Sequence, residues 1–110
     1  MTLFEKIIAR QIPASIVYED EHAVAFRDVN PQAPVHLLVV PRKPIPRLSE
    51  ATPEDHAVLG RCLDAARRAA AVEGLRSYRV VVNDGDDAGQ SVYHLHLHVL
   101  GGRKFTWPPG

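Results

Sequence analysis

The sequence predicts an α+β fold in which about five antiparallel strands pack against one long helix and one short helix. Three observations support this prediction. Residues 94–100 alternate strictly between polar and apolar side chains, as in a half-buried strand. Residues 35–40 form a nearly continuous apolar run, which is typical of a strand buried on both faces. Residues 53–73 carry apolar side chains at helical spacing and end at Gly74.

Shorter patterns predict the remaining elements, which are a helix at residues 2–10 and strands at residues 15–18, 23–27 and 78–82. In the first helix, Thr2 and Glu5 have the spacing of a capping box. The last of these strands is expected to form a hairpin with residues 94–100. In the long helix, Thr52 is the expected N-cap. The predicted buried positions of that helix are Leu59, Cys62, Leu63, Ala66 and Ala70.

Length and composition limit the possible functions. A chain of 110 residues is one domain with a modest core. The 13 basic and 13 acidic side chains balance, so no charged block indicates a nucleic-acid partner or an anionic membrane surface. One cysteine permits no internal disulfide, and no apolar run approaches the roughly 20 residues of a membrane span. We therefore expect a cytoplasmic protein with no membrane partner.

Three histidines share one face of the predicted 94–100 strand: His94, His96 and His98. A strand that only needed a solvated face has no reason to repeat imidazole, the side chain that titrates near neutrality. In an ideal strand the outer two would lie about 13 Å apart, so at most two of them can share one metal ion. Cys62, His22 and His56 form no ligand-spaced cluster with them. The row favours chemistry on a phosphate, with no metal and no cofactor.

The loop that precedes this strand supports an anion site. Residues 83–91 are polar and contain glycine, and Gly89 would let the backbone approach a ligand closely. Asn83, Gln90 and Ser91 add side-chain donors, and successive backbone N–H groups in such a turn can bind an anion. A plain hairpin connection is the alternative, since Asp84-Gly85 is a common hairpin turn.

At this point the sequence resembles the histidine triad family. Residues 94–100 match the family's signature of three histidines separated by single apolar residues. The longer run 89–103, together with Trp107-Pro108-Pro109-Gly110, is similar to the histidine triad nucleotide-binding (Hint) branch. Asp28, residues 31–34 and His36 fit the same branch. The resemblance covers nearly the whole chain and implies a single domain over residues 1–110.

The resemblance implies a hydrolase of purine nucleoside 5′-phosphoramidates, which releases a nucleoside monophosphate and an amine. His96 would be the nucleophile and form a covalent nucleotidyl-histidine, with its ring held by the His94 carbonyl. The implied catalytic residues are His96, His98, His94, His36 and Ser91. The implied nucleotide-binding residues are Asp28, Asn83, Gly89, Gln90, Ser91, Phe4, Ile7, Phe26, Val29 and His98. Asp28 would hold the ribose hydroxyls.

The resemblance also implies a homodimer whose sheet continues across the two subunits. The tail, residues 101–110, would then bring Trp107 to the partner's site and influence substrate choice. Residues 104–106 match the family less well, which leaves the leaving amine open. Two alternatives remain: a dinucleoside polyphosphate hydrolase of a neighbouring branch, and a nucleotide-binding regulatory protein without turnover.

Overall fold

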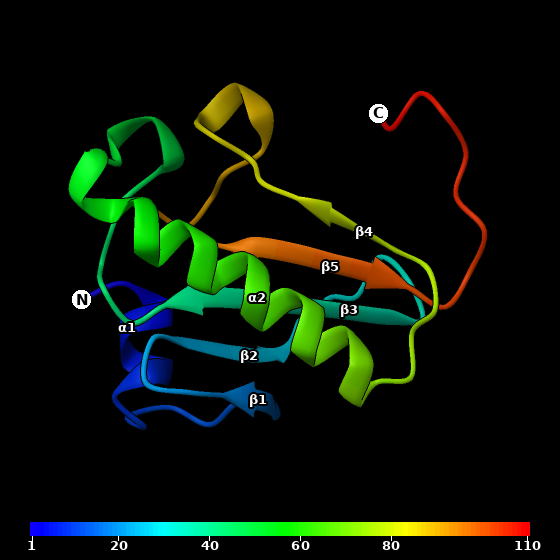
Figure 1. Ribbon diagram of the computed structural model, residues 1–110, viewed down its shortest axis with the longest axis horizontal. Helices are drawn as coiled ribbons and strands as arrows, with labels where there is room; N and C mark the ends of the chain where they lie inside the picture. The colour runs from blue at the N-terminus through cyan, green and yellow to red at the C-terminus, as the bar shows by residue number, and fades with distance from the viewer.

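The computed structural model describes all residues 1–110 and contains one sheet in the order β1-β2-β3-β5-β4 (Figure 1). Its strands are β1 (Ile16–Glu19), β2 (Ala23–Arg27), β3 (Val35–Pro41), β4 (Tyr78–Val81) and β5 (Leu97–Gly101). All neighbouring strands pair antiparallel, and β4 pairs with β5 as predicted. The helices are α1 (Leu3–Ile8) and α2 (His56–Val72), with short 3₁₀ turns η1 (Leu48–Glu50), η2 (Pro53–Asp55) and η3 (Asp86–Ala88). The predicted fold class is confirmed.

Helix α2 covers one face of the sheet (Figure 1). The helix packs against β1, β2, β3 and β5. Its buried side chains are small, namely Cys62, Ala65, Ala66, Ala69 and Ala70. Such small residues let the helix lie close to the sheet, where it buries Leu37, Val39, Leu97 and Val99.

The predicted buried stripe of this helix was wrong at Leu63, and Leu59 is only half-buried. Leu63 is 58% exposed, and Ala65 and Ala69 are buried in its place. Burial at positions 62, 65, 66, 69 and 70 follows the 3.6-residue period, which turns Leu63 toward the rim of the helix. A large apolar side chain is therefore left on the surface.

Helix α1 covers part of the opposite face. Phe4 and Ile7 pack against Val24, Phe26 and Leu38 there. The predicted capping box is present, since the Thr2 side chain accepts from the Glu5 N–H and the Glu5 carboxylate accepts from the Thr2 N–H. At the turn η2, which leads into α2, the Asp55 carboxylate accepts from the Thr52 N–H at 2.9 Å.

The histidine strand begins later than predicted. Strand β5 starts at Leu97, so His94 and His96 precede it and only His98 lies within it. Leu97 pairs with Val39, and continuing the ladder would bring Leu95 opposite Pro41, which has no N–H to donate. The Leu95 N–H instead donates to the Ile45 carbonyl at 2.7 Å.

No helix combines the length and apolar character that crossing a bilayer requires.

The two glycines of the α2 region should respond oppositely to alanine. Gly74 follows the helix at φ +70°, a left-handed conformation that disfavours a Cβ. Gly74→Ala should lower the free energy of unfolding by about 1 kcal/mol. Gly60 lies inside the helix with open space around it. Gly60→Ala should therefore raise the free energy of unfolding by about 0.5–1 kcal/mol. Urea unfolding of both variants measures this, and equal signs would contradict it.

Candidate active site

A cavity of about 490 Å³ opens on the sheet face that carries α1. Its apolar wall includes Phe4, Ile7, Phe26, Val29 and Leu38. Its polar lining includes Asp28, Ser91, His96 and His98. Val29 is 99% exposed and therefore lies at the mouth. The cavity thus joins a flat apolar slot to a group of imidazoles, a carboxylate and a hydroxyl.

The tautomer of His96 follows from its hydrogen bond. Its Nδ1 lies 2.7 Å from the backbone carbonyl oxygen of His94. A carbonyl only accepts, so Nδ1 carries the proton and Nε2 keeps its lone pair. The Phe4 ring packs edge-on against this imidazole with centroids 4.9 Å apart. The ring is therefore held in one orientation as a neutral base with an open nitrogen.

The tautomer of His98 is opposite and follows from a chain of hydrogen bonds. The Gln32 backbone N–H donates to His36 Nδ1 at 3.0 Å, so the His36 proton lies on Nε2. His36 Nε2 then donates to His98 Nδ1 at 2.9 Å. His98 must carry its own proton on Nε2, a buried atom with no partner in the protein. That N–H has no acceptor within the protein.

His94 acts through its backbone. Its ring is almost fully buried, and its Nε2 donates to the Pro41 carbonyl at 2.7 Å. The ring does not line the cavity. This hydrogen bond anchors the segment between the 83–91 loop and β5, and so fixes the carbonyl that orients His96.

Burial keeps all three histidines neutral. Desolvation lowers the pKa of His94 and of His96. The pKa of His98 is about 4, because desolvation lowers it most and the neighbouring His96 and His36 also lower it. The ring centroids of His96 and His98 are 5.1 Å apart, and two adjacent cations would repel each other. At neutral pH the cluster therefore offers both a lone pair and an N–H donor.

Ion pairs and internal hydrogen bonds shape the 83–91 loop. Asp84 accepts from the Arg47 guanidinium and from Ser49, which lowers its pKa to about 2. Asp86 accepts from the Tyr93 hydroxyl. These two carboxylates of the loop are thereby engaged by other side chains, and neither lines the cavity. Gly89 has a φ of +95°, which requires glycine.

Gln90 belongs to the structure of this loop. Its carboxamide accepts from the Gly85 N–H at 2.9 Å and donates to the Pro46 and Val92 carbonyls. Its backbone N–H donates to the Gly85 carbonyl. Since every donor of this residue is engaged, we correct the expectation that its side chain serves a ligand. Asn83, Gly89 and Gln90 do not line the cavity, whereas Ser91 does.

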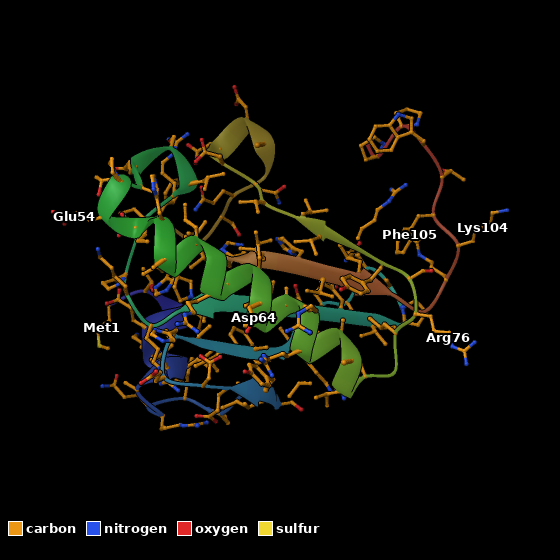
Figure 2. All side chains as sticks on the ribbon, in the orientation of Figure 1. Met1, Glu54, Asp64, Arg76, Lys104 and Phe105 are labelled. Atoms are coloured by element: carbon orange, nitrogen blue, oxygen red, sulfur yellow. The ribbon has the colours of Figure 1, made fainter.

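The C-terminal tail lies away from this cavity. Figure 2 shows Lys104 and Phe105 beyond the end of the sheet. The Arg79 guanidinium lies over the Phe105 ring at 5.0 Å and near the Trp107 ring at 5.9 Å. Trp107 is 81% exposed and does not line its own subunit's cavity. Any role at an active site would be at that of another subunit.

Comparison with known proteins agrees with this geometry. A family model for the HIT domain matches residues 9–105. The chain belongs to the HIT family. It is 61% identical over 110 residues to an uncharacterized HIT-like protein of Synechocystis, covering 99% of this chain and 96% of that one. It is 50% identical over 112 residues to a 14 kDa zinc-binding protein of Zea mays, covering 99% and 88%.

Solved structures share the fold over the full length. A HIT family hydrolase from Legionella pneumophila superposes with a TM-score of 0.96 at 47% identity, covering 100% of both chains. A HIT family hydrolase from Clostridium thermocellum gives 0.93 at 40% identity, covering 96% of this chain and 93% of that one. The five-stranded antiparallel sheet with one long helix is thus the HIT fold.

Sequence reasoning missed several contributors to the site of this HIT protein, among them Gln32 and Leu38. Gln32 acts through its backbone N–H, which no side-chain pattern reveals. Leu38 lines the cavity and could have been found, because it lies two residues from His36 on the same strand face. The predicted site residues Phe4, Ile7, Phe26, Val29, Asp28, Ser91, His96 and His98 all line the cavity.

The buried imidazole of His98 should make stability depend on pH. In the unfolded chain its pKa is near 6.5, whereas in the folded protein it is about 4. Below pH 6.5 the unfolded state binds the extra proton, so stability is full above pH 6.5 and is lost toward pH 4. His98→Asn should make the fall between pH 6.5 and 5 shallower by up to about 1 kcal/mol per pH unit. The exposed His56→Asn is the control, and equal slopes in the two variants would contradict the expectation.

Proposed function

We propose that this HIT family protein is a purine nucleoside phosphoramidase of the Hint type, acting through a covalent nucleotidyl-histidine on His96. The observation that carries the proposal is the His96 Nδ1–H bond to the His94 carbonyl. It leaves Nε2 as a neutral nucleophile at the wall of a cavity. Nucleophilic catalysis divides one difficult displacement at phosphorus into two easier ones.

The first step forms a bond between His96 Nε2 and phosphorus and breaks the P–N bond to the amine. The amine leaves with a proton, which we assign to Ser91 or His98, both in the cavity lining. His96 becomes an N-phosphoryl imidazolium that keeps its Nδ1 proton on the His94 carbonyl. In the second step, water attacks phosphorus, the P–Nε2 bond breaks, and one water proton restores the donor. The products are a nucleoside monophosphate and a free amine.

The cavity accounts for recognition of the nucleoside. The slot between Phe4, Ile7, Phe26 and Leu38 has the apolar walls that suit a flat base. Asp28 lines the same cavity, and a carboxylate can accept from both hydroxyls of a ribose. We assign the purine preference to the Hint resemblance.

The phosphoryl oxygens would lie between His96 and the loop. His98 and Ser91 line the cavity, and we assign the unpartnered His98 Nε2–H and the Ser91 hydroxyl as the donors to these oxygens. Gly89 lets the backbone come close, and Asn83 lies beside it, with its Nδ2 at 3.7 Å from the position of a Cβ on that glycine. Preorganised donors of this kind stabilise charge in the transition state. His36 acts behind His98 by fixing its tautomer.

The zinc-binding name of the Zea mays relative raises the question of a metal. Ligand atoms of Asp28, His36 and His98 lie within 4.8 Å of one another. The Gln32 N–H, however, faces His36 Nδ1 and holds the proton of that ring on Nε2, the atom that would have to bind the metal. The three residues therefore do not fit a zinc site without breaking this bond, and no step of the mechanism uses one.

His96→Ala should reduce kcat on a fluorogenic adenosine phosphoramidate by at least about 100-fold, because it removes the nucleophile. The exposed His56→Ala should keep full activity. Addition of a chelator should leave the wild-type rate unchanged. A His96→Ala rate within about threefold of the wild type would exclude this nucleophile. Tight mononucleotide binding without turnover would indicate the regulatory alternative, and preference for dinucleoside polyphosphates would indicate the neighbouring branch.

We also propose that two copies form a homodimer through β4. This strand is an edge of the sheet, and α2 packs chiefly against the other four strands. Tyr78 and Val80 are exposed on it, and Leu63 is exposed on the neighbouring helix. An unpaired edge with an uncovered apolar face favours a two-fold partner that continues the sheet. The tail beside Arg79 would then lie close to the second subunit, which is where Trp107 would affect substrate choice.

Val80→Lys should shift the protein toward the monomer, because it places a charge on this edge strand. Sedimentation equilibrium at micromolar concentration measures the mass. Val29→Lys, also at an exposed apolar residue but far from β4 in the sheet order, should leave the mass of a dimer unchanged. A wild-type mass of one chain would refute the dimer.

A further inference from the structure

The Asp28 carboxylate lies directly beside the histidine cluster. Its Oδ2 is 3.4 Å from His36 Nε2, the atom that donates to His98. Its Oδ1 accepts from the Asn30 N–H at 2.9 Å, and its own N–H donates to the His36 carbonyl at 2.9 Å. The carboxylate is therefore fixed beside the imidazoles before any ligand enters.

No other acidic side chain lines the cavity. Glu5, on α1, acts on His94 and not on the two cavity-lining histidines. The one basic side chain in the lining is Arg27, and its guanidinium is paired with Glu73. Asp28 is consequently the anion that faces the cluster from the end of β2.

The proposed chemistry creates a cation in this buried cluster. When His96 attacks phosphorus, its ring becomes an imidazolium, and burial disfavours that charge. The charge of Asp28 acts in the opposite direction, since it raises the pKa of both His96 and His98 against the lowering by desolvation. A fixed anion near a developing cation stabilises the transition state more than the neutral ground state.

We propose that Asp28 is the counter-charge of the His36–His96–His98 cluster, in addition to any contact with the sugar. It is a positioning residue in this role, because it acts through the His36–His98 pair and through its field at His96. The inference rests on the proposed nucleotidyl transfer to His96. It predicts that Asp28 matters even for a substrate that has no ribose hydroxyls.

The test combines one substitution with two substrates. Asp28→Asn keeps the size and the acceptor to the Asn30 N–H but removes the charge. Each protein is assayed with an adenosine phosphoramidate and with its 2′,3′-dideoxy analogue. Asp64→Asn is the matched control, because Asp64 lies on α2, on the opposite side of the sheet, paired with Arg67 and Arg68 (Figure 2). Thermal melting verifies that both variants fold.

If Asp28 is the counter-charge, Asp28→Asn should lower kcat about tenfold or more on both substrates. If it only holds the ribose, the loss falls on KM of the ribose substrate and the dideoxy substrate is unaffected, which would overturn the inference. Asp64→Asn should match the wild type on both. A loss confined to the ribose substrate thus separates the two roles.

A second measurement does not need turnover. In the unliganded protein, the protonation midpoint of His98, followed by ¹⁵N chemical shifts of the ring, should fall in Asp28→Asn because the neighbouring anion is gone. An unchanged midpoint would overturn the inference. If the wild type hydrolyses neither substrate, the proposed function fails, and this titration alone decides whether Asp28 is the counter-charge.

Discussion

The hydrogen bond from His96 Nδ1–H to the His94 carbonyl is the constraint on which the site depends. It requires a backbone carbonyl that is not part of the sheet ladder. The structure provides one because β5 begins at Leu97. The preceding residues turn instead toward the segment after β3, where the Pro41 and Ile45 carbonyls accept from His94 Nε2 and the Leu95 N–H. The late start of one strand thus makes an imidazole into a defined base.

A second chain of hydrogen bonds gives the neighbouring ring the opposite polarity. It begins at the Gln32 backbone N–H and passes through His36 to His98. Within one cavity, His96 presents a lone pair and His98 presents an N–H. The same chain holds the His36 proton on Nε2. Two identical side chains thereby serve different purposes.

Burial keeps the imidazoles of both hydrogen-bond arrangements neutral. The imidazoles lie on the face opposite α2, where desolvation lowers their pKa and keeps them neutral. The same burial makes it unfavourable to form a cation there. Asp28 lies where it can offset part of that cost. The Arg47–Asp84 pair and the Gln90 carboxamide fix the 83–91 loop. The loop therefore does not have to be ordered when a ligand binds.

The sequence by itself determined the elements, because alternation, apolar runs and caps are local signals. The α+β class, the strand at residues 23–27 and the Thr2–Glu5 capping box are predictable in this way, as is the row of histidines. Only the tertiary structure decided the start of β5, the exposure of Leu63 and the internal role of Gln90. Each of these three features depends on contacts between residues that are far apart in the sequence. The tautomers of His96 and His98 were decided in the same way, since they depend on backbone atoms of His94 and Gln32. Backbone hydrogen-bonding groups are common to nearly every residue, so no side-chain pattern could reveal them.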